Sequence, residues 1–234
     1  MTVQIPLPFK YQEAQDFDTF YPGPNREIVE SLQKNAINCR EQLVFIWGES
    51  GLGKTHLLQA SCKKAHESNR TAMYIPLRQI VTFDPALLDE IDRYTLVCID
   101  DIQTIAGDTQ WEPALFNFFN RHRDNGHRLV ICADLPPNNL AIQLPDLATR
   151  LLWGVTLRMN PLNDSDKIQA MIFKAKALGF DLPTNVGRYL LNRYARDMPS
   201  LWFLLENLER GTLIAQRKLT IPFVKKYLME CGQQ

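Results

Sequence analysis

Residues 48–55 form a glycine-rich stretch whose residue types and spacing suit the binding of phosphate groups. The stretch fits the pattern GxxxxGK[ST], and its residues are Gly48, Glu49, Ser50, Gly51, Leu52, Gly53, Lys54 and Thr55. Glycines allow the backbone to curve closely, so that successive N–H groups face phosphate oxygens. We predict that this stretch and the adjacent His56 bind a nucleotide, with Lys54 as a catalytic cation on the β- and γ-phosphates and the Thr55 hydroxyl on Mg²⁺. The alternative is a glycine-rich turn that carries an ordinary lysine.

A pair of carboxylates follows a second apolar run. Residues 96–99 read LVCI and lead directly into Asp100 and Asp101. Carboxylates suit Mg²⁺ and water, so we predict that Asp100 holds the metal, directly or through water, and that Asp101 orients or deprotonates an attacking water. Such a pair also caps helices and turns. The distance along the chain from Thr55 is enough for a strand–helix–strand crossover, which favours the metal site.

Short apolar runs alternate with amphipathic stretches along the first two thirds of the chain. The continuous runs are typical of parallel strands that are covered on both faces, and they lie at residues 43–47, 72–75, 96–99 and 129–133. Helical spacing is found at residues 55–68 and 111–123. This alternation predicts an α/β fold with a parallel sheet.

The strand signals stop near residue 160. Helical patterns follow at residues 166–178, 186–196 and 201–216. We therefore predict an N-terminal tail and linker at 1–15, a P-loop nucleotide-binding domain at 16–160 and a small helical lid domain at 161–234.

Composition limits the classes of partner and compartment. Lys plus Arg and Asp plus Glu are equal at 26 each, so no broad electrostatic attraction to nucleic acid or to a membrane is expected. The five cysteines form no CxxC pair, and no histidine is spaced to complete a zinc site. The start of the chain has no signal-peptide pattern, and no apolar run is long enough for a membrane span. These features predict a cytoplasmic protein.

Several stretches together resemble the AAA+ domain of the bacterial replication initiator DnaA, over residues 17–228. They are residues 16–20 (DFDTF), 48–58 (GESGLGKTHLL), 98–103 (CIDDIQ), 150–154 (RLLWG) and 220–224 (TIPFV). We expect neither the helix-turn-helix domain nor the long N-terminal region of the initiator, so the chain is similar to the shortened Hda-type regulators that inactivate DnaA. The resemblance implies an AAA+ fold that binds ADP or ATP with Mg²⁺.

The resemblance also implies roles for individual residues. Arg150 matches the arginine finger, which would reach the γ-phosphate of a neighbouring subunit; alternatively it forms a surface ion pair or stacks on Trp153. Asp134 matches the first polar sensor, which positions water or reports phosphate loss, although an Asp before Leu-Pro-Pro also suits a turn.

The second sensor departs from the family pattern. The arginine expected at the start of a lid helix is replaced by Pro199, which suits an early helical position but cannot contact a phosphate. The candidate substitutes for it are Arg193 and Arg196. We therefore expect weak intrinsic ATPase activity at most.

The N-terminal segment QIPLPF is similar to the sliding-clamp-binding motif of the Hda family. Its amide and apolar anchors can enter a pocket while the prolines keep the peptide extended, and the predicted clamp residues are Gln4, Ile5, Leu7, Pro8 and Phe9. The alternative is an N-terminal strand or arm that packs on the core of the same chain.

Three functions remain open at this stage. In the first, the chain is held on the sliding clamp, the beta subunit of DNA polymerase III, and triggers hydrolysis of DnaA-bound ATP, which prevents over-initiation. DNA would be contacted only through the clamp, and no membrane is involved. The second is a helicase-loader-like ATPase that binds single-stranded DNA and a replicative helicase. The third is a nucleotide-stabilised adaptor. Head-to-tail self-association, as a homodimer or a larger oligomer, is also expected.

Overall fold

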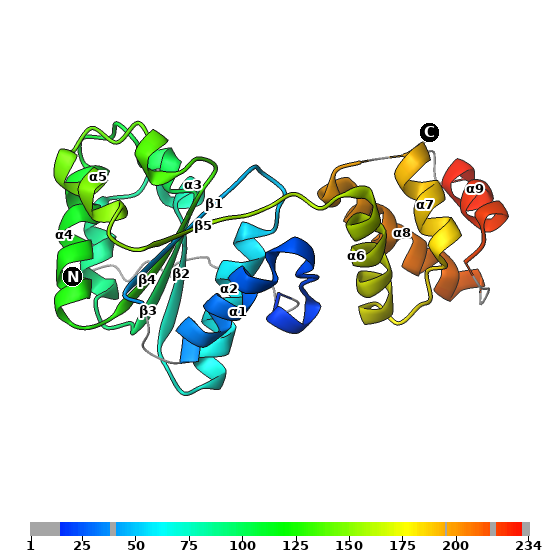
Figure 1. The fold of residues 1–234 in the computed structure, drawn as a ribbon, viewed down its shortest axis with the longest axis horizontal. Helices are drawn as coiled ribbons and strands as arrows, with labels where there is room; N and C mark the ends of the chain where they lie inside the picture. The colour runs from blue at the N-terminus through cyan, green and yellow to red at the C-terminus, as the bar shows by residue number, and fades with distance from the viewer. Residues whose placement is uncertain (1–14, 38–40, 195, 216–218, 231–234) are drawn as a thin grey trace. The chain divides into compact units, whose positions relative to one another are not determined.

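The computed structural model describes residues 15–37, 41–194, 196–215 and 219–230 (Figure 1). The chain divides into two compact units. Among the described residues, the first unit contains residues 15–20 and Glu27–Met159, and the second contains Tyr21–Arg26 and those from Asn160 onward. No helix in the described ranges has the length and apolar character needed to span a membrane.

The first unit is built on a parallel sheet of five strands in the order β2-β3-β4-β1-β5. The strands are β1 (Leu43–Trp47), β2 (Ala72–Pro76), β3 (Leu96–Asp100), β4 (Arg128–Ala133) and β5 (Val155–Arg158). Every strand pair is parallel, which confirms the predicted α/β class. The four predicted strands begin and end within one residue of β1 to β4. The edge strand β5 is largely exposed, and for this reason it has no continuous apolar run.

Helices cover both faces of the sheet because the side chains of each strand alternate between the faces. One face, with Val44, Cys98 and Val130, packs against helices α1 (Arg26–Ile37) and α2 (Lys54–Glu67) and the 3₁₀ turn η1 (Phe17–Thr19). The other face carries Phe45, Ile99 and Ile131. The elements on that face are α3 (Leu77–Ile80), η3 (Pro85–Ile91), η4 (Ile102–Ile105), α4 (Trp111–Asp124) and α5 (Pro145–Leu151). In Figure 1, α1 and α2 lie on one side of the strands, and α4 and α5 lie on the other.

The carboxyl ends of the three central strands meet at one edge of the sheet. Trp47 at the end of β1 pairs with Ala133 at the end of β4, and β3 ends beside them at Asp100. The loop after β1 leads directly into α2, which begins at Lys54. This topology gathers at one edge the three segments from which the sequence predicts nucleotide chemistry.

The second unit is helical. Its helices are α6 (Asp164–Ala177), α7 (Thr184–Arg193), α8 (Met198–Ala215) and α9 (Ile221–Glu230). Buried leucines such as Leu190 and Leu205 form a core with Met171 and Val224. Helices α6 to α8 match the three predicted helices with shifts of up to three residues.

The short segment Tyr21–Arg26 belongs to the helical unit. Asn25 is buried, and its Nδ2 donates to the Asn160 carbonyl at 2.9 Å while its Oδ1 accepts from the Asn160 N–H at 2.7 Å. The Tyr21 hydroxyl lies 3.5 Å from the Asp166 carboxylate. The predicted boundary near residue 160 leaves this segment with the sheet domain, whereas the structure groups it with the helices. The hydrogen bonds that hold it join residues far apart in the sequence, and such contacts leave no local sequence pattern.

Candidate functional site

The loop between β1 and α2 has the backbone of a phosphate cradle. Gly51 and Gly53 have positive φ of 82° and 89°, a region that glycine enters without strain. A Cβ atom on Gly53 would lie only 2.7 Å from the Phe20 ring, so the ring itself requires glycine there. Gly53 is the N-cap of α2 and has no side chain to cap the first turn, so the amides of that turn remain available to an anion. The tip of the loop is formed by Glu49, Ser50, Gly51 and Leu52.

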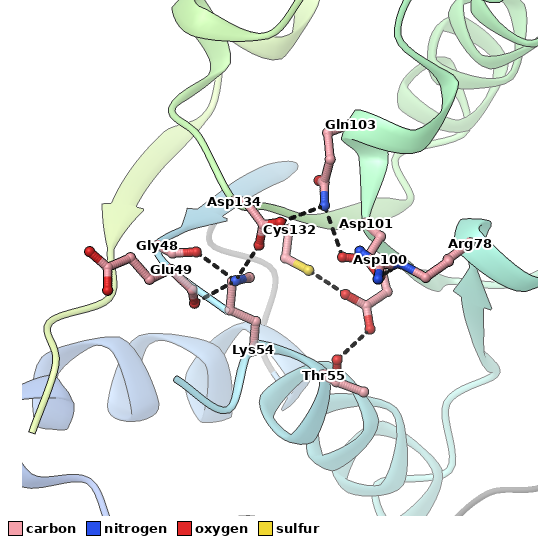
Figure 2. A network of polar contacts seen from close by, with 10 residues as sticks. All are labelled: Gly48, Glu49, Lys54, Thr55, Arg78, Asp100, Asp101, Gln103, Cys132 and Asp134. Atoms are coloured by element: carbon pink, nitrogen blue, oxygen red, sulfur yellow. Dashed lines mark hydrogen bonds and ion pairs between the residues drawn. The ribbon is translucent and has the colours of Figure 1, made fainter. Parts of the chain in front are cut away.

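The Lys54 ammonium lies inside this loop (Figure 2). Lys54 is 6% exposed, and its Nζ donates to the Gly48 carbonyl at 2.6 Å, to the Glu49 carbonyl at 2.9 Å and to Asp134 Oδ1 at 2.9 Å. Three acceptors satisfy the three N–H groups of the ammonium, which makes burial of the charge tolerable. The arrangement holds a cation where phosphate oxygens would approach the loop.

Asp100, the last residue of β3, lies against the start of α2. It is 3% exposed, and its Oδ2 accepts hydrogen bonds from the Thr55 and Tyr74 hydroxyls, each at 2.7 Å. Its Oδ1 accepts from the Cys132 thiol. Burial and the adjacent Asp100 charge raise the pKa of both Tyr74 and Cys132 above their ordinary values, so both remain protonated donors at neutral pH. The Thr55 hydroxyl and the Asp100 carboxylate are oxygen ligands of the type that Mg²⁺ prefers, so the residues present fit the predicted metal.

Asp101 turns away from Asp100. Its φ of 58° is in the left-handed region, and its carboxylate pairs with Arg78 Nε at 3.1 Å. Gln103 Nε2 donates to Asp101 Oδ1 at 3.0 Å and to Asp134 Oδ2 at 3.2 Å. A polar network therefore runs from Arg78 through Asp101, Gln103 and Asp134 to Lys54, as Figure 2 shows. The structure thus brings the predicted residues Asp101 and Asp134 together beside the phosphate loop.

His56 points toward the segment that precedes α1. Its Nε2 lies 2.7 Å from the Asp16 carbonyl oxygen, and its ring packs edge-on against Phe20 with 5.2 Å between the centroids. Asp16 also pairs with Lys63 of α2 at 2.9 Å. His56 therefore ties residues 16–20 to the back of the phosphate loop, and its predicted contact with a nucleotide stays a prediction.

Arg150 lies in α5, away from the phosphate loop of its own chain. Its guanidinium carbon is 3.8 Å from the centroid of the Trp153 ring and 5.9 Å from that of Phe116. Trp153 lines a cavity of about 410 Å³ together with Leu43 and Leu129, near the amino ends of β1 and β4. The phosphate loop follows the carboxyl end of β1, and a strand of this length spans about 16 Å. Within the described residues, no carboxylate pairs with Arg150.

Two family models match the chain. Residues 11–158 match the bacterial DnaA ATPase domain, which covers more than half of the sequence. Residues 164–228 match the lid domain of Hda. The chain belongs to the DnaA family. The DnaA-type ATPase domain and the Hda lid together identify a DnaA-related AAA+ protein and a regulator of replication initiation.

Solved structures with a similar fold include DnaA proteins and a RuvB protein. Domain III of the Thermotoga maritima replication initiation protein DnaA has a TM-score of 0.78 at 22% identity, covering 95% of this chain and 98% of that one. AMPPCP-bound DnaA from Aquifex aeolicus has a TM-score of 0.72 at 21% identity, covering 85% of this chain and 66% of that one. A Thermotoga maritima RuvB variant has a TM-score of 0.67 at 13% identity, covering 94% and 73%. These likenesses show a shared AAA+ fold.

The lid of this DnaA-family chain has Pro199 as the second residue of α8. The Asp197 side chain accepts from the Ser200 N–H at 2.9 Å, so the start of the helix is capped from just before the proline. Arg196, the candidate substitute for a sensor arginine, pairs with Asp164 of α6 at 3.0 Å. Arg193 is the last residue of α7.

Four residues of the site were not predicted from the sequence, namely Tyr74, Arg78, Gln103 and Cys132. The alternation of side chains along β2 and β4 could have placed Tyr74 and Cys132 on the face of Asp100, given the strand register. No local motif indicates Arg78 or Gln103, because their partners depend on the turns after β2 and β3. The predicted clamp-binding residues 4–9 lie outside the described residues.

Proposed function

We propose that the DnaA-type unit binds ADP or ATP with Mg²⁺. The observation that carries this proposal is the enclosed Lys54 ammonium beside the Thr55–Asp100 pair, which together provide a phosphate cation and two oxygen ligands. When bound, Mg²⁺ would neutralise the phosphate charge. Thr55 and Asp100 would hold it, while the α2 amides and Lys54 would orient the phosphates. Asp101 and Asp134 would orient water.

We also propose that the chain inactivates DnaA by stimulating hydrolysis of DnaA-bound ATP. Arg150 would supply its guanidinium to the nucleotide of a neighbouring DnaA subunit. Its position near the amino ends of the strands and its lack of a carboxylate partner among the described residues both suit action in trans. In GTPases, an arginine finger increases the rate by about 10³–10⁵.

The N-terminal segment would tether the chain to the sliding clamp. Gln4, Leu7 and Phe9 are its amide and apolar anchors. Two or three such anchors, less the cost of ordering the peptide, give a binding free energy of about −8 kcal/mol, or micromolar affinity. Simultaneous contact with DnaA would strengthen this attachment through avidity.

The test follows ADP formation from ATP-bound DnaA, with and without DNA-loaded clamp. The wild-type chain should stimulate hydrolysis, and stimulation should be largest with clamp. Arg150→Ala should remove the stimulation while nucleotide and clamp binding persist. Arg123→Ala is the matched control, because Arg123 also lies beside Trp153, at 5.6 Å, but pairs with Asp124. Full stimulation by Arg150→Ala would exclude Arg150 from the mechanism.

The tail is tested separately with a triple variant in which Gln4, Leu7 and Phe9 are alanine. This variant should keep nucleotide binding and lose retention on immobilised clamp. Undiminished retention would reject the proposed motif. The isolated wild-type chain should hydrolyse ATP only slowly, since Pro199 offers no charge to a phosphate, and rapid turnover by the isolated chain would contradict that expectation.

A further inference from the structure

We propose that Tyr74 and Cys132 are positioning residues for Asp100, which hold its carboxylate in the orientation needed for Mg²⁺-dependent nucleotide binding. This inference rests on the proposed nucleotide site and deepens it, because it assigns the support of the metal-binding carboxylate to two neighbouring strands.

Strand register brings these side chains to one point of the sheet. Tyr74 of β2 pairs with Cys98 of β3, so the side chains of Tyr74, Cys98 and Asp100 lie on the same face. Ile99 of β3 pairs with Ile131 of β4, and the next residues, Asp100 and Cys132, therefore lie side by side on that face. This is the face against which α2 packs. The carboxylate is consequently held from β2 on one side, from β4 on the other and from α2 above.

The donors divide between the two oxygens of Asp100. Oδ2 accepts from the Thr55 and Tyr74 hydroxyls at 2.7 Å each, and Oδ1 accepts from the Cys132 thiol. Among the three donors, only Thr55 belongs to the phosphate-loop motif and offers an oxygen ligand to Mg²⁺. Tyr74 and Cys132 come from the sheet, so their hydrogen bonds fix the rotation of the carboxylate independently of the loop.

Side chains that donate hydrogen bonds to a metal-binding carboxylate have a measurable effect on metal sites. They orient the carboxylate, and their removal typically weakens metal affinity by about 10- to 100-fold. Tyr74→Phe removes one oxygen atom and keeps the ring that packs on the α1–α2 side of the sheet. Cys132→Ala removes the thiol donor, whereas Cys132→Ser keeps a donor at the same position.

The experiment titrates Mg²⁺ into the full chain with a fluorescent ADP analogue, and measures affinity for the same analogue in EDTA. We expect Tyr74→Phe to raise the Mg²⁺ midpoint by about 10-fold while the affinity in EDTA stays unchanged. Cys132→Ala should shift the midpoint in the same direction, and Cys132→Ser should restore it. The matched control is Tyr94→Phe, whose hydroxyl contacts Arg93 near the amino end of β3, at the opposite edge of the sheet.

Each remaining outcome has a distinct meaning. An unmoved Mg²⁺ midpoint in both Tyr74→Phe and Cys132→Ala, with a Mg²⁺-dependent wild type, overturns the positioning roles and leaves the proposed nucleotide site intact. An equal loss of affinity with and without Mg²⁺ assigns the two residues to general structure and also overturns the proposal. A wild-type chain that binds no nucleotide in either buffer overturns the proposed function and this inference with it.

Discussion

His122 is a buried titratable residue of α4 that lies outside the nucleotide site, against the start of β4. It is 1% exposed, and its Nε2 donates to the Arg128 carbonyl at 2.8 Å. Burial, assisted by the adjacent His127 and opposed by that hydrogen bond, lowers the pKa of His122 to about 4. Because the carbonyl accepts from Nε2, the neutral ring carries its proton there, and Nδ1 has no partner among the described residues.

This pKa predicts an acid-sensitive fold. The unfolded chain protonates His122 near pH 6.5, about the ordinary value, whereas the folded chain resists protonation until about pH 4. The unfolded state therefore binds more protons in this window, and stability falls as the pH falls through it, by about 3 kcal/mol in total. His122→Gln, which keeps a donor for the carbonyl, should flatten this dependence in urea unfolding at a series of pH values. Equal slopes for the variant and the wild type would contradict the prediction.

The residues of the site differ in how far the sequence alone could place them. The GxxxxGK[ST] pattern predicts Lys54 and Thr55 because the motif itself lies within one loop and the first turn of one helix. Asp100 was predicted from its place after an apolar strand. Its donors Tyr74 and Cys132 could not be assigned, because their contacts depend on which strands are neighbours and on the register between them.

At the scale of elements, Glu112 connects α4 to the segment that leads into α5. It is 2% exposed and lies in the first turn of α4, where a negative charge also suits the helix dipole. Its carboxylate accepts from the N–H groups of Gly107 at 2.6 Å, Gln143 at 3.0 Å and Leu144 at 2.7 Å. Leu144 is the N-cap of α5, the helix that carries Arg150. The carboxylate therefore fixes the start of that helix.

Glu112→Ala should destabilise the first unit by about 3 kcal/mol, since it leaves several backbone donors without their charged acceptor. Thermal unfolding measures the loss. The proposed stimulation of DnaA-bound ATP hydrolysis should fall more than nucleotide binding, because α5 carries Arg150 and contributes no residue to the phosphate loop. Glu90→Ala, which removes an exposed carboxylate of η3, is the matched control and should leave both properties unchanged. An unaltered melting temperature in Glu112→Ala would refute the role.

The elements themselves were predicted best where burial is complete. Strands β1 to β4 are covered on both faces, and continuous apolar runs give their bounds within one residue. Strand β5 pairs only with β1 and reads Val-Thr-Leu-Arg, so its apolar signal is weak. Helix α1 lies outside the predicted helices, although its buried residues Val29, Leu32 and Ala36 follow helical spacing.

At the scale of the whole molecule, the chain passes between the two units three times. The crossings follow Phe20, Arg26 and Met159. The helical unit is thus completed by a segment that precedes every strand of the sheet in the sequence. Asn25 anchors that segment through two reciprocal hydrogen bonds to the Asn160 backbone. Its amide imitates a paired strand residue, accepting from one backbone N–H and donating to the carbonyl of the same residue.

Asn25→Ala should therefore destabilise the helical unit by about 2 kcal/mol, because both hydrogen bonds are lost at a buried position. Hydrogen exchange resolved by segment measures this directly, and the amides of α6 and α7 should exchange faster while those of β1 and β4 stay protected. Asn185→Ala, at an exposed position of α7, is the matched control and should leave exchange unchanged. Equal acceleration in both units would mean that they unfold as one body, and unchanged exchange in α6 would show that residues 21–26 contribute nothing to the helical core.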